Sequence, residues 1–236
     1  MFPFKDENPS PVTPWVTYLL ILTNTSVFLM EILSGPRGFQ RLIWEYGFIP
    51  AAFLEDPSSN MYRMLTSMFL HGGWLHLLGN MLYLYIFGDN VEAAFGHIKY
   101  LFFYVISGVA ANLVHMWALP FLGIPMDVPA VGASGAISGV LGAYLVFYPQ
   151  ARIMTAVAVW YFITVEPIPA KYYITFWFIW QLIPGLLAGE STGVAYWAHI
   201  GGFIAGLLMA YPYRHRVRYL RRLWVMERYR RYGPYW

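Results

Sequence analysis

Charged residues are spaced so widely along this chain that six stretches of roughly twenty residues contain none. A helix needs about 20 mostly apolar residues to cross the hydrocarbon layer of a membrane. Each stretch is therefore a candidate transmembrane helix. The six stretches are residues 8–30, 72–88, 100–126, 128–150, 172–189 and 191–213.

A seventh apolar run, residues 153–165, lies between Arg152 and Glu166. Runs of about 10 to 14 residues seldom span a membrane. We expect this run to be an interfacial or partly buried connector. The predicted fold class is then all-α, a polytopic membrane protein with a bundle of six transmembrane helices.

The composition excludes three other classes of protein. The chain is 58% hydrophobic and 11% charged, whereas globular proteins average about 45–50% and about 25%. Too few charges remain to cover the surface of a soluble domain. Disordered chains combine low hydrophobicity with high charge, and small disulfide scaffolds need cysteine, of which this chain has none.

Eight arginines crowd into residues 214–231, directly after the last stretch. Positive charge next to a span favours the cytoplasmic side, and an even number of spans brings the N-terminus to that side too. We therefore divide the chain into a cytoplasmic lead (1–14), a membrane domain (15–211) and a basic cytoplasmic tail (212–236). The tail suits anionic lipid headgroups, and we do not expect nucleic-acid binding.

This topology assigns the loops to two sides. Residues 34–64 form the longest polar segment and fall outside; their aromatic content predicts a loop that folds back onto the membrane. The segments 119–130 and 188–195 also fall outside, whereas 89–99 and the connector fall inside.

Four of the few polar side chains within the stretches are predicted to lie at one depth. The second, fourth and sixth stretches all run from outside to inside, and each of the four residues lies within about two turns of the start of its stretch. His76 and Asn80 are four residues apart and share a helix face. Scattered helix-to-helix hydrogen bonds give no reason for one common depth, so we interpret His76, Asn80, Ser134 and His199 as a site.

Glycines predict close approach of the helices that carry Ser134 and His199. Gly132 and Gly135 flank Ser134, and Gly202 and Gly206 have the small-xxx-small spacing of packed membrane helices. Gly202 lies three residues after His199, on nearly the same face. The same contact could bring His199 to Ser134, a pairing in which imidazole can take the proton of a serine nucleophile.

Three motifs in this order resemble the rhomboid family of intramembrane serine proteases. They are His76-Leu-Leu-Gly-Asn80, Gly132-Ala-Ser134-Gly135, and Ala198-His199-Ile-Gly-Gly202-Phe-Ile-Ala-Gly206. The similarity extends over residues 15–211. It implies six helices around a water-filled cavity that opens outward, with a membrane-embedded first external loop.

The resemblance also implies roles for the motif residues. Ser134 and His199 would form the catalytic dyad, and His76 and Asn80 would be oxyanion-hole donors. We expect no metal and no cofactor. The substrate would be a transmembrane segment of another membrane protein, cut near its outer end. A bacterial inner or plasma membrane is the expected location, and the sequence does not predict the natural substrate, regulation or oligomeric state.

Several points stay open at this level. Some family members have an aromatic residue one turn after the nucleophile, stacked on the imidazole, where this chain has Ser138. Trp197, Tyr196 or a hydrogen bond are the alternatives for orienting His199. We read Gln181 as an interhelical hydrogen-bonding group, and His71 as either a cavity residue or a loop histidine.

Two other functions compete with proteolysis. An inactive rhomboid-like protein could bind membrane segments for quality control, but both Ser134 and His199 are present here. A transporter could relay protons through intramembrane histidines, but the sequence shows no inverted repeat and no carboxylate in the outer halves of these stretches.

Overall fold

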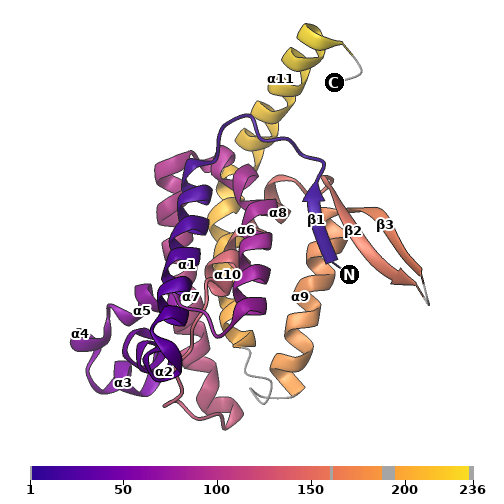
Figure 1. Ribbon diagram of the computed structural model, residues 1–236. Helices are drawn as coiled ribbons and strands as arrows, with labels where there is room; N and C mark the ends of the chain where they lie inside the picture. The colour runs from indigo at the N-terminus through magenta and orange to yellow at the C-terminus, as the bar shows by residue number, and fades with distance from the viewer. Residues whose placement is uncertain (1, 160–161, 188–194, 234–236) are drawn as a thin grey trace.

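A computed structural model describes residues 2–159, 162–187 and 195–233, and it is mostly helical (Figure 1). In chain order the elements are β1 (Phe2–Asp6), α1 (Trp15–Leu33), α2 (Gly35–Tyr46), α3 (Pro50–Glu55), α4 (Pro57–Asn60), α5 (Arg63–Thr66), η1 (Ser67–Phe69), α6 (Trp74–Phe95), α7 (His97–Leu122), α8 (Ser134–Phe147), β2 (Arg152–Val159), β3 (Phe162–Pro169), α9 (Ala170–Leu187), α10 (Tyr196–Ala210), η2 (Tyr211–Tyr213) and α11 (Arg214–Tyr232).

Each of the six charge-free stretches overlaps one helix of a bundle, namely α1, α6, α7, α8, α9 and α10. Helix α8 is central: it contacts α6, α7, α9 and α10, and most of its residues are buried. By length and hydropathy alone, two described helices, α1 and α7, could cross a membrane, and α8 is apolar but shorter. By that criterion two spans are found among the described residues rather than six. Helices α8 and α10, with 14 and 15 residues, are too short to meet it.

Glycines set the distance between α8 and α10. A Cβ on Gly202 would lie 1.9 Å from the carbonyl oxygen of Gly135, and one on Gly206 would lie 2.0 Å from that of Gly139. The two backbones therefore touch directly, as the small-xxx-small spacing predicts.

The loop 34–64 is folded into four short helices, α2 to α5, at the end of the bundle opposite α11 (Figure 1). Its helices are tied together by side chains that bond to backbone carbonyls. Arg63 donates to the carbonyls of Trp44 and Gly47, and the hydroxyl of Thr66 donates to that of Tyr46.

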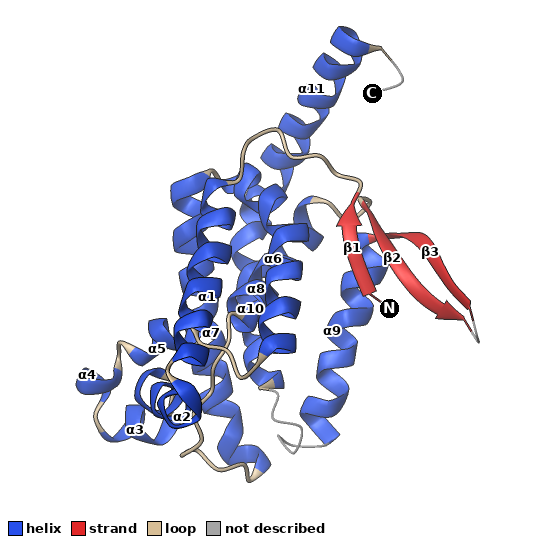
Figure 2. Cartoon of the chain, viewed as in Figure 1, coloured by secondary structure: helices blue, strands red, loops and turns tan. Residues whose placement is uncertain are grey.

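The all-α prediction is wrong in one region, because the connector 153–165 belongs to an antiparallel sheet. Strands β2 and β3 form a hairpin, and β1 from the N-terminal lead pairs with β2 (Figure 2). The run is rich in valine, isoleucine, threonine and aromatic residues, which favour extended chain. It is too short to span a membrane as a helix but long enough to pair with its neighbour. The lead 1–14 is thus partly a strand.

The expected inner loop 89–99 is also wrong, since α6 continues through Asp89 to Phe95. Its Glu92 is fully buried and accepts hydrogen bonds from the backbone N–H groups of Val16 and Thr17 at the start of α1. A carboxylate at a helix N-terminus satisfies free N–H groups and opposes the positive end of the helix dipole. The buried carboxylate of Glu92 therefore anchors the start of α1, and α6 does not end where its charged residues begin. The expected turn 188–195 lies almost entirely outside the described residues.

Candidate active site

Ser134 and His199 meet where α8 and α10 cross. Ser134 is the first residue of α8, and His199 lies in the first turn of α10. The distance between His199 Nε2 and Ser134 Oγ is 2.8 Å. Each side chain is only partly exposed. The glycine contact between the two helices thus places a hydroxyl within hydrogen-bonding distance of an imidazole nitrogen.

The other ring nitrogen of His199 contacts Gln181 of α9, with 2.8 Å between Nδ1 and Oε1. An amide oxygen only accepts, so this contact places the imidazole proton on Nδ1. Nε2 then carries the lone pair that faces Ser134. The side chain of Gln181 is 9% exposed.

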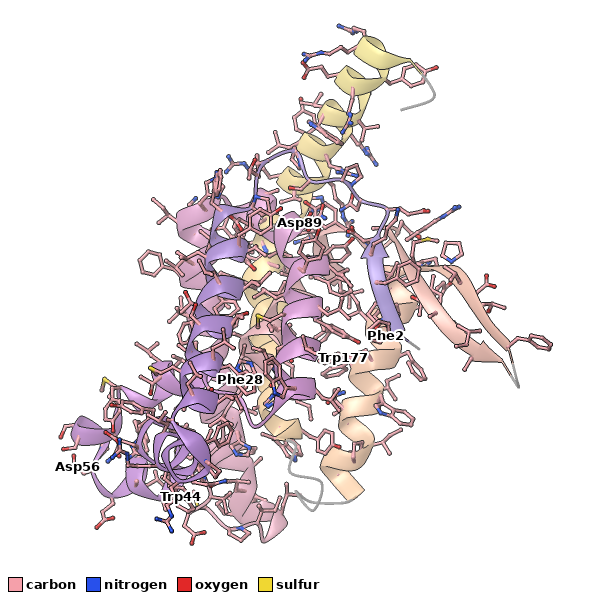
Figure 3. The ribbon with its side chains drawn as sticks, in the orientation of Figure 1. Phe2, Phe28, Trp44, Asp56, Asp89 and Trp177 are labelled. Carbon is pink, nitrogen blue, oxygen red and sulfur yellow. The ribbon has the colours of Figure 1, made fainter. Side chains whose placement is uncertain are left out.

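Two aromatic rings border the same imidazole. Trp177 of α9 lies 6.2 Å from it at an interplanar angle of 34°, and Tyr196 lies edge-on at 6.4 Å. Figure 3 shows Trp177 between α9 and α6. Of the two aromatic alternatives raised for orienting His199, Tyr196 contacts it, whereas Trp197 donates from Nε1 to the carbonyl of Gly185.

Gly132 allows the chain to turn into α8 beside His76. Its φ is +126°, and an added Cβ would lie 2.7 Å from both Cε1 and Nε2 of the His76 ring. A side chain here would therefore strain the backbone and push His76 away. The backbone N–H of Gly132 donates a hydrogen bond to the carbonyl of Ser67.

His76 and Asn80 lie one turn apart on α6. The Nδ1 atom of His76 accepts from the backbone N–H of Gly72 at 3.3 Å, which leaves Nε2 as the N–H that faces the Gly132 region. The side-chain amide of Asn80 donates to the carbonyl of His76 at 3.0 Å. An amide NH2 has two hydrogens, so Asn80 keeps one for a ligand.

A cavity of 980 Å³ is lined by all four predicted site residues and by Gln181. Its remaining wall is largely apolar, with Trp177, Ile137 and Leu141 among the lining residues. A second cavity of 420 Å³ lies between α6 and α9, lined by Tyr83, Tyr173, Phe176, Trp177, Trp180 and Gln181. Gln181 and Trp177 therefore border both spaces.

Two other residues singled out from the sequence have their hydrogen bonds elsewhere, although Ser138 also lines the cavity. His71 is fully buried behind His76, with 5.1 Å between ring centroids, and its backbone N–H donates to Glu31. The hydroxyl of Ser138 donates to the carbonyl of Ser134 in its own helix. Ser138 thus does not replace a stacking aromatic side chain.

The partnership between Gln181 and His199 was not foreseen from the sequence, although a signal was there. Under the predicted topology, α9 runs from inside to outside, and Gln181 lies about two turns before the end of its stretch. That depth matches the depth of the four residues assigned to the site.

The sequence profile of the Rhomboid domain family matches residues 58–216. The chain belongs to the rhomboid family. Rhomboids are intramembrane proteases, and the family implies an integral membrane protein. The matched region contains α6 to α10 and all four residues of the predicted site.

Relatives of this rhomboid include proteins from organelles and bacteria. RHOMBOID-like protein 5 of Arabidopsis thaliana is 30% identical, covering 92% of this chain and 73% of the relative. RHOMBOID-like protein 6, mitochondrial, of the same plant is 26% identical over 88% and 71%. Rhomboid protease AarA of Providencia stuartii is 28% identical over 84% and 72%. This range does not support the expected bacterial inner membrane.

The match covers only part of some relatives. It spans 38% to 57% of the length of three others from Arabidopsis thaliana and Saccharomyces cerevisiae.

Proposed function

We propose that this protein is a serine endopeptidase that cleaves transmembrane segments of other membrane proteins through a Ser134/His199 dyad. The observation that carries the proposal is the 2.8 Å contact between His199 Nε2 and Ser134 Oγ at the wall of a 980 Å³ cavity. Among the described residues that line the cavity there is no carboxylate, so the base is a histidine without the acid of a triad.

The reaction divides into acylation and deacylation. Ser134 Oγ attacks the substrate carbonyl carbon while its proton moves to His199 Nε2. The C–N bond then breaks, and Nε2 returns that proton to the leaving amine. Water attacks the resulting ester, giving its proton to Nε2. The bond to Oγ breaks, and Oγ takes the proton back, which regenerates both side chains.

Negative charge on the attacked oxygen needs donors that are already in place. Nε2–H of His76, the free hydrogen of the Asn80 amide and the backbone N–H of Ser134 are the three proposed donors. The Ser134 N–H begins a helix, where N–H groups lack intrahelical acceptors and the dipole is positive. Removing one such donor typically costs about 10²- to 10³-fold in kcat.

The proposal places all six bundle helices across the membrane and both termini on the inner side. The cavity is bordered by residues 123–125, residues 128–131 and Ala195, at the end of the bundle opposite α11. The arginines of α11 then lie on the inner side, near anionic headgroups. The helices α2 to α5 lie at the outer face. The N-terminal lead, membrane domain and basic tail keep the boundaries predicted from the sequence.

A helical substrate presents few reactive carbonyls, because its backbone is already hydrogen-bonded. We expect cleavage near the outer end of a transmembrane segment, between small residues, with glycine or proline just beyond to unwind the helix. Cleavage that is most rapid in an uninterrupted leucine helix would contradict this preference.

The test is cleavage of a single-span substrate by the protein reconstituted in liposomes. Ser134→Ala and His199→Ala are each expected to lose more than about 10³-fold in kcat/KM. Ser107→Ala is the matched serine control, because Ser107 is buried against α8 outside the cavity. His215→Ala, at an exposed position in α11, is the histidine control.

Both controls are expected to cleave like the wild type. Equal rates of cleavage by the wild type and Ser134→Ala would overturn the proposal, and no cleavage by either would leave binding without catalysis as the function.

A further inference from the structure

The general base has a single described polar partner on its non-reacting side. His199 contacts Ser134 through Nε2 and Gln181 through Nδ1. Among the described residues, the other titratable side chains around it are His76 of α6, His115 of α7 and Tyr196 of its own helix. None of these described side chains is a carboxylic acid. The task that a carboxylate performs in a triad, holding the imidazole in one tautomer, therefore falls to an amide.

An amide can hold the imidazole in either of two states. With Oε1 toward Nδ1, the imidazole proton is on Nδ1, and Nε2 is free to accept the serine proton. With the amide reversed, its NH2 donates to Nδ1, the imidazole proton moves to Nε2, and the ring can no longer act as a base toward Ser134. The structure has the first arrangement. The orientation of this one side chain thus decides whether the dyad is competent.

Helix α9 presents two residues to the base from one face. Trp177 and Gln181 are four residues apart, so they lie one above the other on the helix. Trp177 borders the imidazole ring, and Gln181 bonds its Nδ1 atom. Both residues also line the cavity between α6 and α9. The position of α9 therefore affects His199 through these two side chains.

We propose that Gln181 is the positioning residue for His199. The inference rests on the proposed dyad. It extends that function by a residue that does not touch the reacting atoms and by a helix that carries neither member of the dyad.

The test compares three variants in the liposome assay over a range of pH. Gln181→Met keeps length and apolar packing but cannot accept a hydrogen bond; kcat is expected to fall about 10- to 10²-fold with little change in KM, as expected for one lost hydrogen bond to a charged group. Gln181→Glu can only accept. It should retain cleavage, and its carboxylate should stabilise the imidazolium, moving the acid limb of the pH–rate profile to higher pH. Gln40→Met, at an exposed position on α2, is the matched control and should cleave like the wild type.

A purely structural Gln181 gives a different pattern. Equal losses in the Met and Glu variants with an unmoved pH profile would overturn the inference, and so would wild-type kcat in Gln181→Met. If Gln181→Met does not fold, as judged by its thermal unfolding in detergent, the pH profile of Gln181→Glu decides alone. Labelling of Ser134 by a fluorophosphonate probe separates the two proposals. A wild type that neither cleaves nor labels contradicts the dyad, whereas Ser134-dependent cleavage that ignores Gln181 contradicts only the inference.

Discussion

The two sides of the active-site histidine are built in different ways. On the α8 side, α10 packs backbone against backbone, with Gly202 over Gly135 and Gly206 over Gly139. On the α9 side, the contacts are made by side chains, such as the Gln181–His199 pair, the stacked rings of Phe178 and Phe203, and a 2.7 Å hydrogen bond between the hydroxyls of Tyr83 and Tyr173.

The difference separates what must be rigid from what can move. Two packed backbones cannot separate without opening a void along the whole contact, so the distance from Ser134 to His199 is fixed by the fold. A side-chain hydrogen bond such as the one between Gln181 and His199 can be broken at a cost of about 0.5–1.5 kcal/mol, without separating two backbones. The side of α9 that faces away from the bundle is open, and Trp180 is 62% exposed.

The largest expected effect comes from the backbone contact. Gly206→Ala places a methyl group against the carbonyl oxygen of Gly139, and backbone cannot yield as a flexible side chain can. We expect the free energy of unfolding to fall by about 1–3 kcal/mol, with activity falling as α8 and α10 separate. Unfolding in detergent, followed by circular dichroism, measures the first effect.

Gly79→Ala is the matched control for stability. Gly79 is a helical glycine of α6 with open space where a Cβ would stand. This substitution is expected to leave stability unchanged or to raise it by about 0.5–1 kcal/mol. Equal destabilisation by Gly206→Ala and Gly79→Ala would contradict the prediction that the close packing of α10 on α8 depends on Gly206.

A smaller effect is expected at the sheet that leads into α9. The carboxylate of Asp6 accepts hydrogen bonds from Tyr144 of α8 and Asn90 of α6, and burial raises its pKa from 3.8 to about 6. The folded state then binds the Asp6 proton more tightly than the unfolded state. This contribution favours folding below about pH 4 and is lost as pH rises to about 6, by at most about 3 kcal/mol.

Asp6→Asn removes that titration. We expect the stability of the variant, measured by urea unfolding between pH 4 and 6.5, to fall less with rising pH than that of the wild type. Neighbouring Asp89 and Arg221 are present in both proteins, so the difference between the two curves reports the titration of Asp6 together with its influence on the pKa of Asp89. Parallel curves would contradict the prediction.

The smallest effect is expected at the hydroxyl pair between α6 and α9. Tyr83→Phe and Tyr173→Phe are each expected to cost about 0.5–1.5 kcal/mol of stability. Their effects should not add in the double variant, because both remove the same bond. A faster cleavage rate in these variants would show that release of α9 limits turnover, and fully additive losses of stability would show that the bond is absent in solution.

The positions of the helices and the meeting of the motif residues could be predicted because each depends on a local pattern. Charge-free stretches mark helices, and glycine spacing marks where α8 and α10 touch. Common depth groups His76, Asn80, Ser134 and His199, and the structure brings all four to one cavity.

The remaining features depend on partners that are distant in sequence. The sheet joins residues 2–6 to residues 152–169, and no pattern within the N-terminal lead indicates a strand partner. Glu92 reads as a loop charge until α1 is known to begin beside it. Gln181 reads as a bonding group without a target until α9 is placed against α10.

The sheet has a practical consequence for work with this protein. Strand β1 pairs with β2, and the hairpin runs from β3 into α9 at Ala170, so residues 2–6 are connected through one short path to the helix that bears Gln181. A purification tag or a truncation at that end disturbs an edge strand that pairs with the hairpin leading into α9. The far end of α11, which projects from the bundle (Figure 1), is the better place to attach one.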